Sequence, residues 1–140
     1  MPKTRRSAKT QRRGAVTVEA AVAIPILFLF VFAQIEFARA NMVRHALRTA
    51  AFEGCRAGIV LGTTEVDVET AAQQSLDAVG LKQYTVTVTP SAITPETQQV
   101  TVTVTVPINE NSWIAPLFLD GVILENSMTM ERELVDQMIF

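Results

Sequence analysis

The chain has 140 residues, enough for one small domain, and 49% of them are apolar, which is ordinary for a globular protein. Residues 1–14 form a basic leader with six of the twelve basic side chains and no acidic one, whereas the rest carries fourteen acidic residues and six basic ones. Such asymmetry points to targeting, a membrane or nucleic acid, but a leader without interleaved aromatics that precedes an apolar run argues against nucleic acid.

An apolar run follows the leader. Ala20 to Ala33 is fourteen residues without a polar side chain, and a start at Ala15 makes it nineteen, interrupted by two polar residues. At 1.5 Å per residue the longer stretch spans about 28 Å and the shorter about 21 Å, against a hydrocarbon core of about 30 Å. We therefore predict a transmembrane helix over residues 15–36. Glu19 would then lie in or near lipid, where a carboxylate needs a partner or a position near the surface.

Three processing outcomes fit this segment. A signal peptidase could cut after the small-residue pattern at residues 38–40, although charged residues including Glu36 crowd that region. The helix could also stay uncut, as a plain anchor. In the third outcome a prepilin-type peptidase cuts between Gly14 and Ala15, where the basic leader meets the apolar helix. The new α-ammonium of Ala15 could then pair with Glu19 of the same or an adjacent subunit, which offsets the cost of a buried carboxylate.

The stretch from Arg12 to Ala40 resembles the N-terminal signature of the TadE-like family of pilin-like proteins. The matching positions are Gly14 before the cut, Glu19 as fifth residue of the mature chain, Pro25 within the apolar helix, and Glu36 with Arg39 at its outer end. The resemblance implies a minor pilin (pseudopilin) of the tight-adherence (Flp-type) pilus and secretion system, matured by a prepilin peptidase. Its partners would be the lipid bilayer, that peptidase and other pilins or pilus-assembly proteins.

These positions also have physical interpretations. Pro25 removes one helical hydrogen bond, so we expect it to bend or loosen the helix. Glu36 and Arg39 stand three residues apart and are expected to pair along the helix. Under the family resemblance we expect Glu19, Pro25, Glu36 and Arg39 to be subunit contacts.

The distribution of charge also predicts a topology. The leader's cations outnumber the basic residues just beyond the span, so the positive-inside bias keeps the N-terminus in the cytoplasm and residues 37–140 outside it. With the resemblance, this gives a single-pass protein of the bacterial inner membrane that is incorporated into a pilus or serves its assembly. The alternative is an uncleaved, membrane-tethered periplasmic binding or scaffold protein.

Two helices are predicted in the first part of the chain. The first continues past the apolar run to about Gly58, where Gly54 and Gly58 weaken its end. Its expected apolar stripe is Ile35, Ala38, Met42, Ala46, Thr49 and Phe52, and its expected solvated basic stripe is Arg44, Arg48 and Arg56. The second helix is predicted over Glu65–Val79, with Thr64 and Asp67 as a capping box. Its apolar stripe is Val68, Ala71, Ala72, Leu76 and Val79.

The period then changes to two. Tyr84–Thr89 and Val100–Val106 alternate valine with threonine, which predicts an antiparallel hairpin with its valines on one face. Val122–Glu133 would supply a third strand with Leu124, Met128 and Met130 on one face. Pro107–Ser112 is expected to be a linker, and Trp113–Leu119 a short helical turn packed on the sheet. The predicted fold class is α+β: a long N-terminal helix, a second short helix and a small antiparallel three-stranded sheet.

Residues suited to catalysis or metal binding are sparse. His45 and Cys55 are ten residues apart, about 15 Å along a helix axis, which is too far for a thiolate–imidazole pair. A single cysteine allows no internal disulfide, and we expect Cys55 to be a small packed residue. The sequence contains no Cys-x-x-Cys and no glycine-rich phosphate loop. We therefore predict a structural protein rather than an enzyme, with no cofactor, metal or small-molecule substrate.

Overall fold

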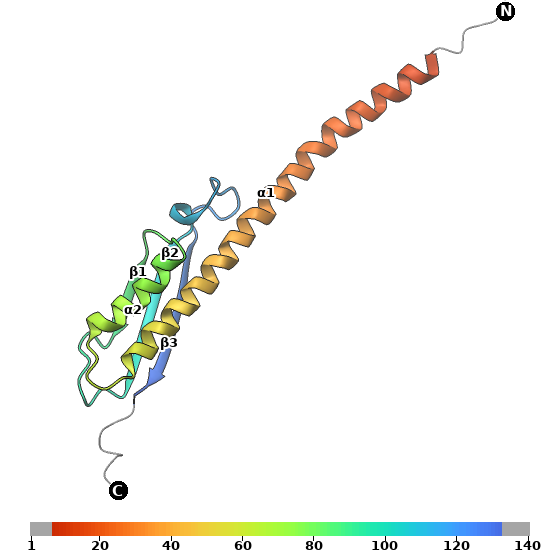
Figure 1. The fold of residues 1–140 in the computed structure, drawn as a ribbon. Helices are drawn as coiled ribbons and strands as arrows, with labels where there is room; N and C mark the ends of the chain where they lie inside the picture. The colour runs from red at the N-terminus through yellow and green to blue at the C-terminus, as the bar shows by residue number, and fades with distance from the viewer. Residues whose placement is uncertain (1–6, 133–140) are drawn as a thin grey trace, which may run out of the picture. The chain divides into compact units, whose positions relative to one another are not determined.

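The computed structural model describes residues 7–132, with side chains from residue 14 onward. Residues 1–6 of the leader, and Glu133 at the end of the third predicted strand, lie outside the described residues. The elements in chain order are α1 (Ser7–Gly58), α2 (Glu65–Ala78), β1 (Thr85–Thr89), β2 (Gln99–Pro107), the 3₁₀ helix η1 (Asn109–Asn111) and β3 (Ile123–Glu131) (Figure 1). The chain divides into two compact units, Met1–Ile35 and Glu36–Phe140.

The first unit contains the N-terminal part of α1. The described part of this helix already includes Ser7, ahead of the predicted start at Ala15, because lysine, glutamine and arginine residues of this part of the leader favour a helix and no proline lies between Ser7 and Ala15. Among the described residues, α1 is the one helix long and apolar enough to cross a membrane. Its large apolar side chains from Val16 to Phe32 are 40–66% exposed. Such a surface matches the predicted span, which needs an apolar outer face.

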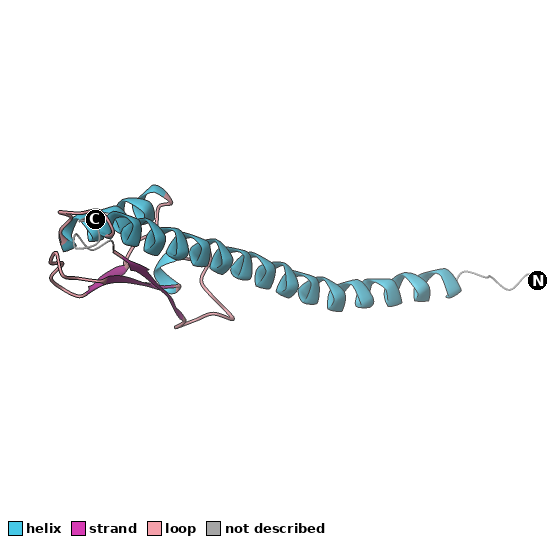
Figure 2. Ribbon diagram, turned by 90° about the horizontal axis from the view of Figure 1, so that it is seen from below, coloured by secondary structure: helices cyan, strands magenta, loops and turns pink. Residues whose placement is uncertain are grey.

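The second unit consists of two helices over one face of a sheet (Figures 1 and 2). The strands are antiparallel in the order β1-β2-β3, with Val102 of β2 opposite Val88 of β1 and Met128 of β3. The inner face of β2 is fully buried: Val100, Val102, Val104 and Val106. These elements confirm the predicted α+β fold, and they follow from the alternation of valine and threonine.

The outer face of the sheet is polar. The hydroxyl groups of Thr101 and Thr129 lie 2.8 Å apart, and those of Thr103 and Ser127 lie 2.9 Å apart. These cross-strand pairs stabilise the sheet where no helix covers it.

The buried face of α1 differs from the predicted stripe. Met42, Thr49, Phe52 and Ala38 of that stripe are exposed. The buried residues are Ala40, Val43, Leu47, Ala50, Ala51, Gly54, Cys55 and Gly58. The prediction followed the larger side chains, but α1 approaches α2 and β2 so closely that small residues fill the contact. A Cβ atom on Gly54 would lie 3.2 Å from that of Ala72, and one on Gly58 would lie 3.0 Å from Val100 Cγ1. The basic stripe of Arg44, Arg48 and Arg56 is exposed, as expected.

The second helix matches its prediction apart from its last residue. Thr64 caps α2, and its capping box with Asp67 is present. The hydrogen bonds that Thr64 donates from its backbone and side chain hold the pKa of the Asp67 carboxyl below its usual value. Val68, Ala72 and Leu76 are buried, whereas Val79 is the exposed C-cap residue that follows the helix.

Candidate functional site

Four of the predicted site residues lie in the first unit. Gly14, Ala15, Glu19 and Pro25 are all exposed on α1, which runs without interruption through the Gly14–Ala15 bond and through Pro25. Glu19 stands one helical turn beyond Ala15 and makes no hydrogen bond or ion pair with another described residue. The proposed roles of these residues in processing and subunit contact remain predictions.

Glu36, in the second unit, binds the loop that joins η1 to β3, which we call the 112–122 loop. Its Oε1 accepts hydrogen bonds from the N–H groups of Leu119 at 2.5 Å and Phe118 at 3.0 Å, and its Oε2 accepts one from Leu117 at 3.3 Å. Three successive backbone N–H groups therefore surround one carboxylate, as in the backbone nests that bind anions.

This contact explains why the predicted helical turn over Trp113–Leu119 is wrong. The segment is irregular, and the N–H groups that a helix would bind to its own carbonyls are bound by Glu36 instead. Pro116 adds to the effect, since it lacks an N–H and disfavours helical geometry at the residue before it.

Arg39, three residues further along α1, binds the start of the same loop. Its Nε donates a hydrogen bond to the carbonyl oxygen of Asn111 at 2.7 Å, and its guanidinium carbon lies 5.0 Å from the centre of the Trp113 ring, in a cation–π contact. The expected ion pair between Glu36 and Arg39 is absent from the described part of the chain. The two side chains instead contact one loop at two points.

Asn111 completes this contact and was not predicted from the sequence. It is 5% exposed. Its Nδ2 donates hydrogen bonds to the carbonyl oxygens of Lys82 at 2.7 Å and Pro107 at 3.1 Å, and its Oδ1 accepts one from the Lys82 N–H at 2.8 Å. The side chain thereby holds the backbone carbonyl that Arg39 binds. The sequence did contain one hint of this role: Asn111 lies in the predicted linker Pro107–Ser112, and Asn side chains in such segments commonly bind backbone groups.

The 112–122 loop is closed at its base and apolar at its surface. Asn109 Nδ2 donates a hydrogen bond to Asp120 Oδ1 at 2.8 Å, and the Gly121 N–H donates one to Asn109 Oδ1 at 3.0 Å. Four large side chains of the loop are exposed: Trp113 by 64%, Ile114 by 47%, Leu117 by 66% and Phe118 by 47%. The expectation that this segment packs on the sheet is therefore wrong for these four side chains.

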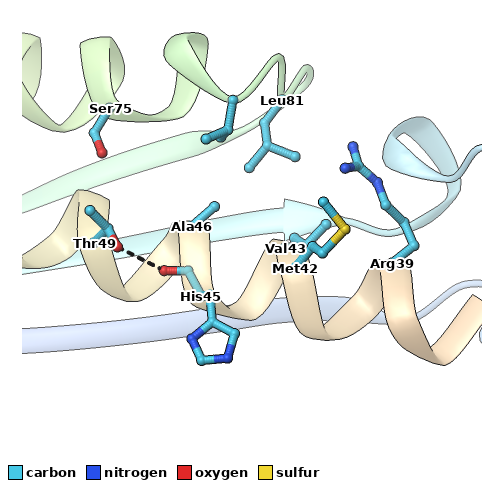
Figure 3. A pocket seen from close by; sticks show the side chains of 9 residues that line it. Arg39, Met42, Val43, His45, Ala46, Thr49, Ser75 and Leu81 are labelled. Atoms are coloured by element: carbon cyan, nitrogen blue, oxygen red, sulfur yellow. Dashed lines mark hydrogen bonds between the residues drawn. The ribbon is translucent and has the colours of Figure 1, made fainter.

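The second unit also contains a groove of about 350 Å³ between α1 and α2 (Figure 3). Its lining is mainly apolar and includes Met42, Val43, Ala46, Val79 and Leu81, with Arg39, His45, Thr49 and Ser75. Nothing in this lining forms a catalytic constellation.

The one histidine and the one cysteine of the chain are kept apart. His45 is exposed at the groove, whereas Cys55 is fully buried in the core and its Sγ donates a hydrogen bond to the carbonyl oxygen of Met128 at 3.1 Å. Burial raises the pKa of the Cys55 thiol. Within residues 7–132 there is no group of three or more His, Cys, Asp or Glu side chains that could hold a metal ion.

The family model of the TadE-like protein matches residues 14–56. This segment contains the five predicted signature positions, so the resemblance is confirmed over less than a third of the chain, without the sheet. Neither a curated protein nor a solved structure matched the chain. The family match and the span-capable α1 fit a membrane protein associated with the tight-adherence pilus, and this family is structural rather than enzymatic.

Proposed function

We propose that the chain is a minor pilin (pseudopilin) of a tight-adherence pilus or secretion system, anchored in the bacterial inner membrane by residues 15–36. The observation that carries the proposal is the family match, which begins at Gly14 and runs along α1 to residue 56. The uncovered apolar surface of α1 supports it, because a helix with such a surface packs against lipid or against the helices of other subunits.

We propose further that a prepilin peptidase cuts after Gly14. A Cβ atom at Gly14 would meet no other atom within 4 Å, and this glycine is not among the described glycines with positive φ. Nothing in the fold therefore requires a glycine here, although glycine inside a helix costs about 0.5–1 kcal/mol relative to alanine. Recognition by a peptidase supplies a reason for keeping it.

In this proposal Glu19 guides assembly. After cleavage the Ala15 ammonium lies one turn from the Glu19 carboxylate, or reaches that of a neighbouring subunit. A carboxylate in lipid favours any association that supplies a cation. Glu19→Ala should therefore leave carbonate-resistant membrane retention intact and weaken crosslinking to partner pilins. Glu19→Gln keeps the shape and removes the charge. If both variants crosslink normally, Glu19 has no role in assembly and only marks the membrane interface.

The decisive experiment is an N-terminal determination on protein extracted from membranes, by intact mass or Edman degradation. We expect a start at Ala15 in cells with the peptidase and a retained leader in cells without it. A retained leader in both strains would favour the uncleaved, membrane-tethered binding or scaffold protein. A start at Asn41 would indicate an ordinary signal peptide.

The proposed topology has its own test. Residues 37–140 should lie outside the cytoplasm, so a reporter fused after Thr89, at the end of β1, should be exported. Cytoplasmic activity of that reporter would contradict the topology.

A further inference from the structure

We propose that the 112–122 loop is a second membrane anchor, which inserts Trp113, Ile114, Leu117 and Phe118 into the head-group region of the bilayer beside the end of the transmembrane span. This inference rests on the proposed function only for the span over residues 15–36.

The loop is attached to α1 close to the end of the apolar run. Glu36 follows the last residue of that run, Ala33, by three residues, which is about 4.5 Å of helical rise. Arg39 follows it by six residues, or about 9 Å. The head-group region is about 5–8 Å thick on each side of the hydrocarbon core. On this spacing Glu36 would bind the loop within that layer, and Arg39 would bind it just beyond the outer edge.

The exposed side chains of the loop suit a membrane interface. Two of the four are aromatic, and the more exposed of these two is Trp113. Tryptophan is enriched at membrane interfaces, because its ring is apolar while its N–H still finds a hydrogen-bond partner there. All four lie within six successive residues of one loop, and exposed apolar side chains that gather in this way often mark a contact with a partner or a membrane.

Several backbone N–H groups of the loop are already hydrogen-bonded within the protein, which suits a less polar environment. The N–H groups of Leu117, Phe118 and Leu119 are bound by Glu36, and the N–H group of Gly121 is bound by the Oδ1 of Asn109. Exposed peptide groups oppose entry into a membrane, so these contacts remove part of the cost of insertion. Arg39, packed on the Trp113 ring, leaves other guanidinium N–H groups for lipid phosphate.

The sole tryptophan of the chain makes a direct test possible, since all indole fluorescence comes from Trp113. The full-length protein is reconstituted into phosphatidylcholine–phosphatidylglycerol vesicles whose acyl chains carry bromine either near the head group or near the bilayer centre. We expect blue-shifted emission and quenching that is stronger with the shallow bromines than with the deep ones.

A matched control moves the indole to the other end of the second unit. The double variant Trp113→Phe/Val66→Trp places it at the start of α2, where Val66 is 68% exposed, close to the 64% of Trp113. The neighbouring Val68 packs beside Gly58, about 33 Å along α1 from Glu36. Its emission should stay red-shifted and lose no intensity with either brominated lipid. Circular dichroism confirms that both proteins are folded.

Several results would overturn the inference. One is equal quenching of the wild type and the double variant. Another is an unquenched Trp113 in protein that resists carbonate extraction, which would leave the span intact and refute only the loop anchor. A blue shift that is insensitive to bromine and disappears when protein is diluted with lipid would assign the loop to a neighbouring protein molecule. Release of the protein by carbonate would refute the span itself, and with it the proposed function.

Discussion

Removal of the Glu36 carboxylate should release the 112–122 loop and leave the sheet folded. A hydrogen bond to a charged group contributes about 1.5–3 kcal/mol to stability. Glu36 is only half-buried, and Leu117 and Phe118 are exposed, so water can replace much of what the carboxylate supplies to the three N–H groups. For Glu36→Ala we therefore expect the free energy that holds the loop closed to fall by about 2 kcal/mol in total, which is the value of about one such bond.

Amide hydrogen exchange of the full-length protein in detergent micelles measures this directly. A loss of about 2 kcal/mol corresponds to about 30-fold faster exchange at Leu117, Phe118 and Leu119 in Glu36→Ala. Glu36→Gln keeps one acceptor oxygen and should fall between the wild type and the alanine variant. The control is Glu110→Gln, which removes the same charge from an exposed residue of η1.

Two outcomes would refute this reasoning. Unchanged exchange at the three loop amides in Glu36→Ala would mean that the carboxylate does not hold the loop. An equal acceleration at the β2 amides, such as those of Val102 and Val104, would mean that Glu36 supports the whole second unit instead.

Three further predictions concern the core and the titrating groups of the second unit. Gly58→Ala should lower the free energy of unfolding in urea by about 1–2 kcal/mol, because overpacking against Val100 and Val68 outweighs the gain in helix propensity. The control is Gly14→Ala, which should not destabilise the protein because a Cβ atom there meets open space. Equal stability of the two variants would contradict the packing argument. The single tyrosine, Tyr84, donates a hydrogen bond to Asp77, and this bond raises the pKa of Tyr84 to about 12. Its contribution to stability should therefore be complete below pH about 10 and lost as pH rises through about 12, and Asp77→Asn should move the midpoint of a tyrosinate absorbance titration down toward about 10. Cys55, buried and with a raised thiol pKa, should react with a disulfide reagent only after urea unfolding, so fast reaction of the native protein would disprove its burial.

Local patterns were enough to predict most of the fold. The alternation of threonine and valine in β1 and β2 specifies both the strands and their buried face, since successive side chains of a strand point to opposite sides. The capping box of Thr64 and Asp67 likewise acts within a single turn. The signature positions from Gly14 to Arg39 also lie in one continuous stretch, so the spacing of these residues along the chain was enough to recognise them.

Features that depend on distant contacts were not predictable in the same way. The buried face of α1 was misassigned because hydropathy favours Met42 and Phe52, whereas close packing against α2 and β2 requires small residues such as Gly54. The contact between Glu36 and Leu119 joins residues 83 positions apart. No local period encodes a carboxylate that binds backbone amides at such a separation, so the segment looked like an apolar turn.

The threonine face of the sheet has a practical consequence for work on this protein. Because Thr103 and Ser127 bind each other on a surface that no helix covers, cysteine or an unnatural amino acid can replace one of them without entering the core. Such a substitution leaves the buried Cys55 behind the strands, so a dye would react at a single accessible thiol. This face is therefore the natural site for a fluorescent label that follows the subunit in living cells.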